Sequence, residues 1–178
     1  MDAVQEERFY TIEDIYALPE GKRAELIDGK IYDMASPGMR HQRISGYLHN
    51  EIYNYIKNHQ GQCEAFAAPF AVFIDKDDYN YVEPDISVIC DPKKLDEKGC
   101  HGAPDWVVEI VSPGSKRMDY YRKLFKYKSA GVREYWIVDM EKESVIVYQF
   151  EKETMEYYPA GDDIPVGIYE DFSIRAEF

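Results

Sequence analysis

The chain has 178 residues, of which 45% are hydrophobic and 31% charged, and its 21 basic and 34 acidic residues give a formal net charge of −13. This length fits one domain that buries enough surface to fold without a disulfide or a metal, and its 16 Tyr, 8 Phe and 2 Trp exclude a disordered acidic polymer. No apolar run approaches the ~18 residues that cross a membrane, and the charge taken as a sum argues against nucleic acid, whose phosphates bind Lys and Arg.

Two features favour a cytoplasmic protein. The first eight residues are acidic, whereas a signal or transit peptide is basic. The three cysteines, Cys63, Cys90 and Cys100, are too few and too irregular for a disulfide framework or a zinc site. We therefore expect them to be thiols in a reducing cytoplasm.

The N-terminal third predicts a helix, a hairpin and a second, longer helix. Residues 11–18 begin with a capping Thr and form the short helix. Asp28-Gly29 between the apolar-patterned runs 24–27 and 30–34 predicts a β-hairpin, because both turn residues need positive φ. From 40 to about 59, apolar residues recur every three or four positions, which is typical of an amphipathic helix of about five turns.

The middle of the chain predicts strands. Residues 63–74 are rich in Phe, Val and Ala and favour an extended segment, and residues 81–90 form a strand that Pro84 interrupts. Residues 93–104 are expected to be a polar loop. The run 105–111 is almost continuously apolar, as in a strand covered on both faces.

The C-terminal part predicts a second helix and further strands. A turn at 112–115 leads into a helix over about 117–130, which Gly131 ends. The strands that follow cover residues 134–138, 145–150 and 153–158. The order of elements indicates a mixed α/β fold with a central sheet flanked by helices. We expect a single domain over 1–178, with a core at about 10–150 and a C-terminal β extension at 151–178.

Two acidic residues on neighbouring strands are the first candidates for chemistry. Asp85 follows Pro84, and Glu109 stands among apolar residues of the doubly covered strand. A carboxylate buried in this way needs an arginine, its own proton or a cation to offset its charge. Mg²⁺ and Mn²⁺ prefer carboxylate, carbonyl and water oxygens. The pair therefore predicts a metal site. Taken alone, Asp85 could be an acid at a turn or strand end, and Glu109 could belong to a core ion pair.

A lysine on the second helix is the third candidate. Tyr120, Leu124 and Tyr127 form the predicted buried stripe of this helix, and Lys123 borders it. Asp119, four residues earlier, can pair with Lys123 or share its site. The alternative is that Lys123 packs its aliphatic part against the protein and extends its ammonium group into water.

Six ordered blocks carry a family resemblance. They are residues 24–32, 41–44, 83–86, 102–113, the trio Asp119, Lys123 and Tyr127, and residues 131–139. This set, spread over roughly 10–147, resembles the bacterial family of putative restriction endonucleases within the PD-(D/E)xK nuclease superfamily. The resemblance implies a restriction endonuclease-like fold of mixed α/β (α+β) type, with a central mixed sheet, an N-terminal hairpin and extra C-terminal strands.

The resemblance also implies roles for individual residues. In the plain superfamily motif the lysine stands two residues after the glutamate, where this chain has Val111. In this family the lysine has moved to the next helix, which fits Lys123, whereas Lys126 lies nearer the solvent. The implied catalytic residues are Asp85, Glu109, Lys123, Glu25 and His41. The implied metal ligands are Asp85, Glu109, the backbone carbonyl of Ile110 and, less certainly, Glu25. The alternative for Glu25 is an exposed strand position, and the alternative for His41 is a helix cap. For Tyr127 it is a core position with the hydroxyl near the site.

The implied activity is hydrolysis of DNA phosphodiester bonds with Mg²⁺ or Mn²⁺. DNA is the implied partner, and a homodimer paired through the tyrosine-rich C-terminal strands is one arrangement that would cut both strands. Two alternatives from other classes stay open. One is a catalytically silent interaction module or a subunit of a mobile-element or defence assembly, and the other is a metal-dependent hydrolase of something smaller than DNA.

The distribution of charge qualifies its sum. Residues 116–134 carry a local charge of +5, and a smaller basic cluster opens the long helix. These stretches supply the nucleic-acid-binding candidates Lys116, Arg117, Arg122, Lys126, Arg40 and Arg43. A solvated helix face is the alternative. We expect a local basic surface beside a metal site.

Overall fold

The computed structural model describes residues 8–112 and 114–178. The first seven residues of the acidic segment, and Pro113 of the predicted turn and of the fourth resemblance block, lie outside this range. Within the described ranges, no helix combines the length and the apolar character needed to cross a bilayer.

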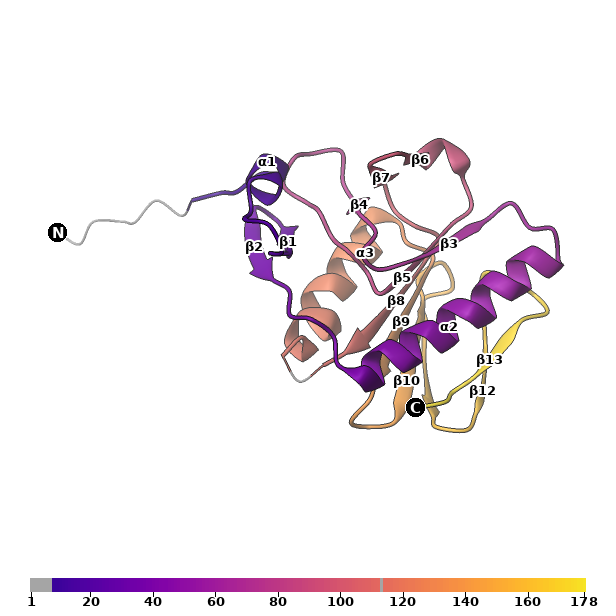
Figure 1. The fold of residues 1–178 in the computed structure, drawn as a ribbon. Coiled ribbons are helices and arrows are strands. Elements are labelled where there is room, and N and C mark those ends of the chain that lie inside the picture. Colours follow the sequence, from indigo (N-terminus) through magenta and orange to yellow (C-terminus); the bar gives the residue numbers. More distant parts are fainter. Residues whose placement is uncertain (1–7, 113) are drawn as a thin grey trace.

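A six-stranded mixed sheet forms the centre of the fold, with the strand order β11-β10-β9-β8-β5-β3 (Figure 1). Its strands are β3 (Glu64–Ala67), β5 (Ile86–Ile89), β8 (Trp106–Val111), β9 (Glu134–Asp139), β10 (Ser144–Gln149) and β11 (Thr154–Pro159). The central pair β8 and β9 is parallel, and the other pairs are antiparallel. The predicted mixed α/β fold with a central sheet flanked by helices is confirmed.

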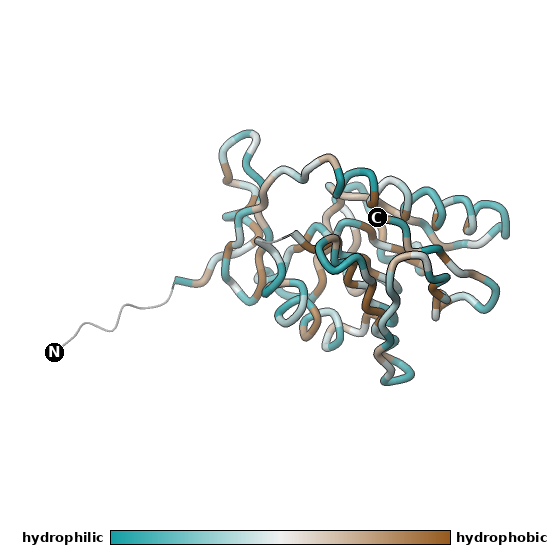
Figure 2. The backbone as a smooth tube through the Cα atoms, turned by 90° about the horizontal axis from the view of Figure 1, so that it is seen from below, coloured by the Kyte–Doolittle hydropathy of each residue, from teal (hydrophilic) through white to brown (hydrophobic). Residues whose placement is uncertain are grey.

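Strand β8 is covered on both faces, as its apolar run predicts. Trp106, Val108 and Ile110 pack in one cluster with α2 (Met39–Asn58). Val107 and Val111 face the other way and pack with Tyr127 of α3 (Leu124–Ala130). Hydrophobic segments accordingly run through the middle of the molecule, and hydrophilic ones lie mostly in peripheral loops (Figure 2).

Smaller elements surround this core. They are the helices α1 (Ile12–Tyr16), η1 (Pro92–Lys94) and η2 (Met118–Lys123), the hairpin β1 (Ala24–Ile27) and β2 (Lys30–Asp33), the three-stranded sheet β4 (Val72–Phe73), β7 (Gly99–His101) and β6 (Leu95–Asp96), and the hairpin β12 (Asp163–Pro165) and β13 (Ser173–Arg175). The hairpin turn has positive φ at both Asp28 and Gly29, as its sequence requires. Ile164 and Ile174 of the last hairpin belong to the same cluster as α2, so the C-terminal segment is part of the main core.

One prediction of local structure is wrong, and the helix predicted over about 117–130 is confirmed with a different helix type in its first half. The segment 93–104 is not only a polar loop, because β6 and β7 pair with each other and β7 pairs with β4. Residues 118–123 form a π-helix before the α-helix begins. In both cases the backbone pairs in a way that apolar periodicity does not reveal.

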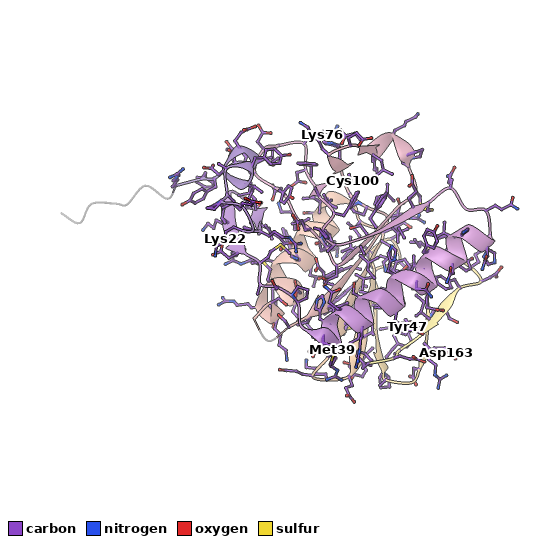
Figure 3. The ribbon with its side chains drawn as sticks, viewed as in Figure 1. Lys22, Met39, Tyr47, Lys76, Cys100 and Asp163 are labelled. Carbon is purple, nitrogen blue, oxygen red and sulfur yellow. A yellow bond between two sulfur atoms is a disulfide. The ribbon has the colours of Figure 1, made fainter. Side chains whose placement is uncertain are left out.

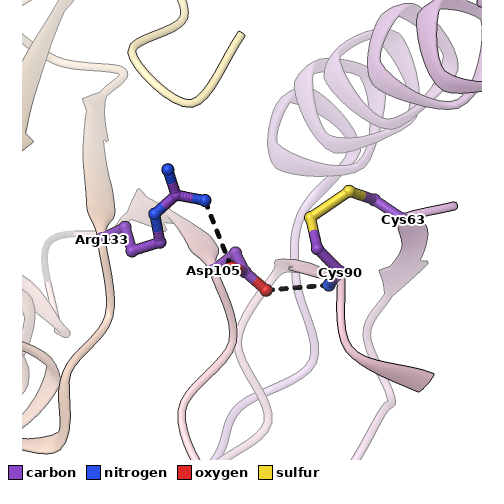
Figure 4. Close-up of a disulfide and its surroundings, with 4 residues drawn as sticks. All are labelled: Cys63, Cys90, Asp105 and Arg133. Carbon is purple, nitrogen blue, oxygen red and sulfur yellow. Dashed lines mark hydrogen bonds and ion pairs between the residues drawn. A yellow bond between two sulfur atoms is a disulfide. The ribbon is translucent and has the colours of Figure 1, made fainter. Parts of the chain in front are cut away.

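The prediction of three thiols is wrong for two of them. Cys63 and Cys90 form a disulfide with a Cα–Cα distance of 3.9 Å (Figure 4). They continue the β3–β5 register by one pair beyond Glu64 and Ile89, so they face each other across neighbouring strands. Cys100 is a free, buried thiol in the interior, in contrast to the exposed Met39 at the start of α2 (Figure 3).

Candidate active site

Sheet pairing brings the two predicted metal ligands together. β5 and β8 pair with Ile86 opposite Val108, and the next position of this register sets Asp85 opposite Glu109. Oδ2 of Asp85 accepts a hydrogen bond of 2.7 Å from the backbone N–H of Ile110. The Nε2 atom of His41, in the first turn of α2, lies 3.2 Å from the same oxygen. One oxygen of Asp85 is therefore fixed from both sides.

Lys123 lies in the middle of the acidic residues. Its Nζ is 2.8 Å from Glu25, 2.9 Å from Glu109 and 3.7 Å from Asp119, and its side chain is only 5% exposed. The prediction that Lys123 borders the buried stripe is wrong, because it is fully inside, and release of its ammonium to water is excluded. Lys126, the competing lysine, instead pairs with Asp28 and Asp75, away from this cluster.

The π-helix η2 explains why Lys123 points inward. Four residues of an α-helix advance about 40° past a full turn, whereas four residues of a π-helix, at roughly 4.4 residues per turn, fall about 30° short of one. The step from Asp119 to Lys123 lies in the π-helix and the step from Lys123 to Tyr127 largely in α3. The two offsets nearly cancel, so the three side chains share one face, and all three are buried.

Glu109 receives two donors on one oxygen. Its Oε1 accepts hydrogen bonds of 2.9 Å from Lys123 and 2.6 Å from the hydroxyl of Tyr127. The prediction that Tyr127 is a core residue with its hydroxyl near the site is therefore confirmed, and its ring is completely buried.

Glu25 enters the cluster through the N-terminal hairpin. Leu26 of β1 pairs with Tyr81, and Oε1 of Glu25 accepts a 3.0 Å hydrogen bond from the backbone N–H of Glu83. Glu25 is 5% exposed, so the alternative of an exposed strand position is wrong. Glu83 in turn is held by Arg23 and by the hydroxyl of Tyr81.

A cleft of about 890 Å³ opens onto these residues. Its lining includes all five predicted catalytic residues and Asp119, together with the linker between β2 and α2 and the loop before η2: Glu25, His41, Asp85, Glu109, Lys123, Asp119, Ser36, Pro37, Gly38, Ser112 and Ser115.

The cluster carries more negative than positive charge. Burial raises the pKa of Glu109 well above its usual value, because Lys123 offsets only part of the penalty. Burial raises the pKa of Asp119 in the same way. Burial alone would lower the pKa of Lys123, but Glu109 and Glu25 raise it well above its ordinary value. Lys123 is therefore an ammonium ion, and the surrounding carboxylates retain unbalanced negative charge, which favours a proton or a cation.

The residues present fit a divalent metal ion. Among the described residues, Oδ1 of Asp85 and Oε2 of Glu109 have no hydrogen-bond partner. Neither oxygen belongs to the fully buried side-chain atoms that lack such a partner. Both residues line the cleft, so each offers one oxygen to it. Within residues 8–112 and 114–178, no three His, Cys, Asp or Glu side chains enclose a metal position. A metal here would therefore need further oxygens, such as the carbonyl of Ile110 and water.

The predicted nucleic-acid contacts divide into two groups. Lys116 pairs with Glu141, Arg40 with Glu143 at 2.8 Å, and Lys126 with Asp28 and Asp75. In the part of the chain that the structure describes, the other three have no acidic partner: Arg43, Arg117 and Arg122. Arg122 lies over the ring of Tyr32, which lines the cleft, at 5.2 Å. The local positive surface is thus smaller than the residue count suggests.

Asp119 pairs with Lys123 and shares its site, as its spacing of four residues from that lysine predicts. It is 2% exposed, lines the cleft and lies beside Lys123. Its backbone carbonyl accepts a 3.0 Å hydrogen bond from the buried hydroxyl of Tyr135.

Comparisons with known proteins show the family and the fold of the chain. Residues 7–177 match the family Uma2, described as a putative restriction endonuclease. A curated relative, the uncharacterized protein slr1290 of Synechocystis sp., is 28% identical over 128 residues, which are 71% of this chain and 66% of that protein, so the match spans slightly less than two thirds of its length. A solved structure of a putative nuclease belonging to DUF820 from Anabaena variabilis is similar with a TM-score of 0.76 and 23% identity, covering 93% of this chain and 94% of the other, and supports the fold.

Proposed function

We propose that this chain, which belongs to the Uma2 family of putative restriction endonucleases, is a metal-dependent endonuclease that hydrolyses DNA phosphodiester bonds. One observation carries the proposal. Asp85 and Glu109 stand opposite each other, each with one oxygen held inside the protein and one free oxygen at the cleft, next to a buried lysine. Two free carboxylate oxygens beside an ammonium ion suit hydrolysis of a phosphate ester.

Asp85, Glu109 and the carbonyl of Ile110 would hold Mg²⁺ or Mn²⁺, and Glu25 reaches the same cluster through Lys123. Such an ion supplies a more acidic bound water and offsets negative charge on the phosphate. The protein residues around it have separate tasks. His41 and the N–H of Ile110 orient Asp85, and Lys123 orients Glu109.

Lys123 acts here as a charge and not as a base. Its raised pKa keeps it protonated at neutral pH, and carboxylates surround its three N–H donors. Its contribution is to offset negative charge that builds up on the phosphate. The hydrolytic water would lose its proton to an acceptor other than Lys123.

Cleavage of supercoiled plasmid with Mg²⁺ or Mn²⁺ tests the proposal. Asp85→Ala and Glu109→Ala are expected to abolish nicking, because each removes a free oxygen from the cleft. Glu97→Ala is the matched control, since Glu97 is exposed in a turn and does not line the cleft. Undiminished nicking by Glu109→Ala would refute the proposal.

A hydrolase of smaller phosphate esters is the second candidate. The pairing of Lys116 with Glu141 and of Arg40 with Glu143 favours it, because it reduces the positive charge available to a long DNA backbone. Parallel assays on nucleotides and on linear, supercoiled and single-stranded DNA separate the two substrates. Absence of any Mn²⁺ binding in calorimetry would instead favour a silent interaction module.

A further inference from the structure

In the part of the chain that the structure describes, the hydroxyl of Tyr127 makes one hydrogen bond, which it donates to Glu109. The distance is 2.6 Å, which is typical of a charge-assisted hydrogen bond from a hydroxyl to a carboxylate oxygen. Lys123 contacts the same oxygen, but it also donates to Glu25 and forms an ion pair with Asp119 at 3.7 Å. Tyr127 is thus the donor that serves Glu109 alone.

The ring of Tyr127 is itself held in place. It is completely buried and meets the ring of Tyr135 edge-to-face, with the centroids 5.0 Å apart at 63°. Tyr135 is anchored in turn, because its hydroxyl donates to the backbone carbonyl of Asp119. The direction of the Tyr127 hydroxyl is therefore fixed by packing and not by the carboxylate that it reaches.

We propose that Tyr127 is a positioning residue, whose hydroxyl occupies Oε1 of Glu109 and so turns Oε2 of Glu109 toward the cleft for a divalent cation. The inference rests on the proposed function. Partners of this kind, which orient a metal-binding side chain without touching the metal, typically change metal affinity by about 10- to 100-fold.

Tyr127→Phe tests the role, with Tyr120→Phe as the matched control. Tyr120 lies on the same helical segment, and its hydroxyl also donates to a buried carboxylate, that of Asp139 at 2.9 Å, outside the cleft. Each variant removes one oxygen atom from the protein. In calorimetric titrations, we expect Tyr127→Phe to bind Mn²⁺ about 10- to 100-fold more weakly than the wild type and Tyr120→Phe to bind it as the wild type does.

A crystal structure of Tyr127→Phe without metal gives a second readout. We expect the carboxylate of Glu109 to rotate or to adopt two conformers. An unrotated carboxylate together with wild-type Mn²⁺ affinity would overturn the inference. If the wild type bound no Mn²⁺, the proposed function would fail, and the orientation of Glu109 in this crystal structure would still decide whether Tyr127 positions it.

Discussion

His41 and Asp85 meet in the lining of the cleft, with Nε2 of the imidazole 3.2 Å from Oδ2 of the carboxylate. The contact joins the first turn of α2 to the residue that precedes β5. Burial would lower the pKa of His41, but the hydrogen bond and charge of Asp85 raise it above its usual value. The contact thus fixes one oxygen of Asp85 and leaves the other to the cleft.

His41→Gln is expected to lower plasmid cleavage about tenfold, because Asp85 loses an orienting partner while it keeps the N–H of Ile110. Nicking rates measured over a range of Mn²⁺ concentrations should show the loss mainly at low metal. His59→Gln, at the far end of α2 and exposed, serves as the control. Equal rates for His41→Gln and the wild type at every metal concentration would contradict this role.

Removal of the buried ammonium ion should destabilise the fold strongly. Lys123→Met leaves Glu109, Glu25 and Asp119 without their shared cation, and such a loss costs about 3–5 kcal/mol. Lys126→Met removes a lysine that pairs nearer the surface and should cost about 1 kcal/mol or less. Urea denaturation at neutral pH measures both free energies of unfolding, and similar losses for the two variants would argue against the buried cluster.

Two glutamates near the cleft should oppose DNA binding. Glu141 pairs with Lys116 and Glu143 with Arg40, so phosphates must compete with them for these cations. The double variant Glu141→Gln/Glu143→Gln is expected to bind a DNA duplex roughly threefold to tenfold more tightly, since each exposed pair contributes at most about 1 kcal/mol.

The control for that experiment makes the same change of net charge elsewhere. Glu13 and Glu97 are exposed and do not line the cleft, so Glu13→Gln/Glu97→Gln should raise the affinity only slightly through the long-range field. Fluorescence anisotropy at several salt concentrations compares the two double variants. The same gain in both would show that net charge alone is responsible.

Thiol titration checks the cysteine pairing. The denatured, unreduced chain should release one reactive thiol, from Cys100, and reduction should raise the number to three. In the native protein, burial raises the pKa of Cys100 to about 11, so its thiolate is scarce at pH 8 and alkylation should be very slow. Three thiols before reduction would refute the disulfide between Cys63 and Cys90.

Glu134 gives a pH dependence of stability. Burial raises the pKa of its carboxyl, although the N–H donors of Gly167, Trp136 and Ile168 oppose the shift. The folded protein therefore binds this proton more tightly than the unfolded chain. The corresponding stabilisation is complete below about pH 4.3, the ordinary value for Glu, and is lost as the pH rises through the folded-state pKa.

The variant Glu134→Gln cannot lose this proton, so its stability relative to the wild type should improve as the pH rises from about 4 to 7. Urea denaturation of both proteins across that range measures the difference. A difference that does not change with pH, or that moves against the variant, would contradict the assigned shift.

Sequence periodicity predicted the framework of the site because the pattern of β8 is unambiguous. Its apolar run predicted a strand buried on both faces, and Glu109 is the charged residue within that run. Asp85 could be paired with Glu109 because two carboxylates on neighbouring strands can share one cation. The hairpin was predicted correctly because Asp28-Gly29 tolerates the positive φ angles that a two-residue hairpin turn requires.

Other features depend on pairing between distant segments, which local patterns do not encode. The apolar spacing over 117–130 predicts a regular α-helix, whereas the π-helix rotates Lys123 from the edge of the buried stripe to its centre. Cys63 and Cys90 are 27 positions apart and meet only through the β3–β5 register. The acidic partners of Lys116 and Arg40 lie in a turn more than 20 residues away from either.

The π-helix also determines which insertions, deletions and substitutions would leave this site intact. An added or deleted residue in an α-helix rotates the side chains that follow by about 100°, and here the wider turn is what aligns Asp119, Lys123 and Tyr127. Tyr121 and Arg122 point outward, and Tyr121 is 72% exposed, so many residue types would fit at these positions. Selection should therefore act on the length of this segment more strictly than on its surface composition, and related chains should vary here by substitution and not by insertion.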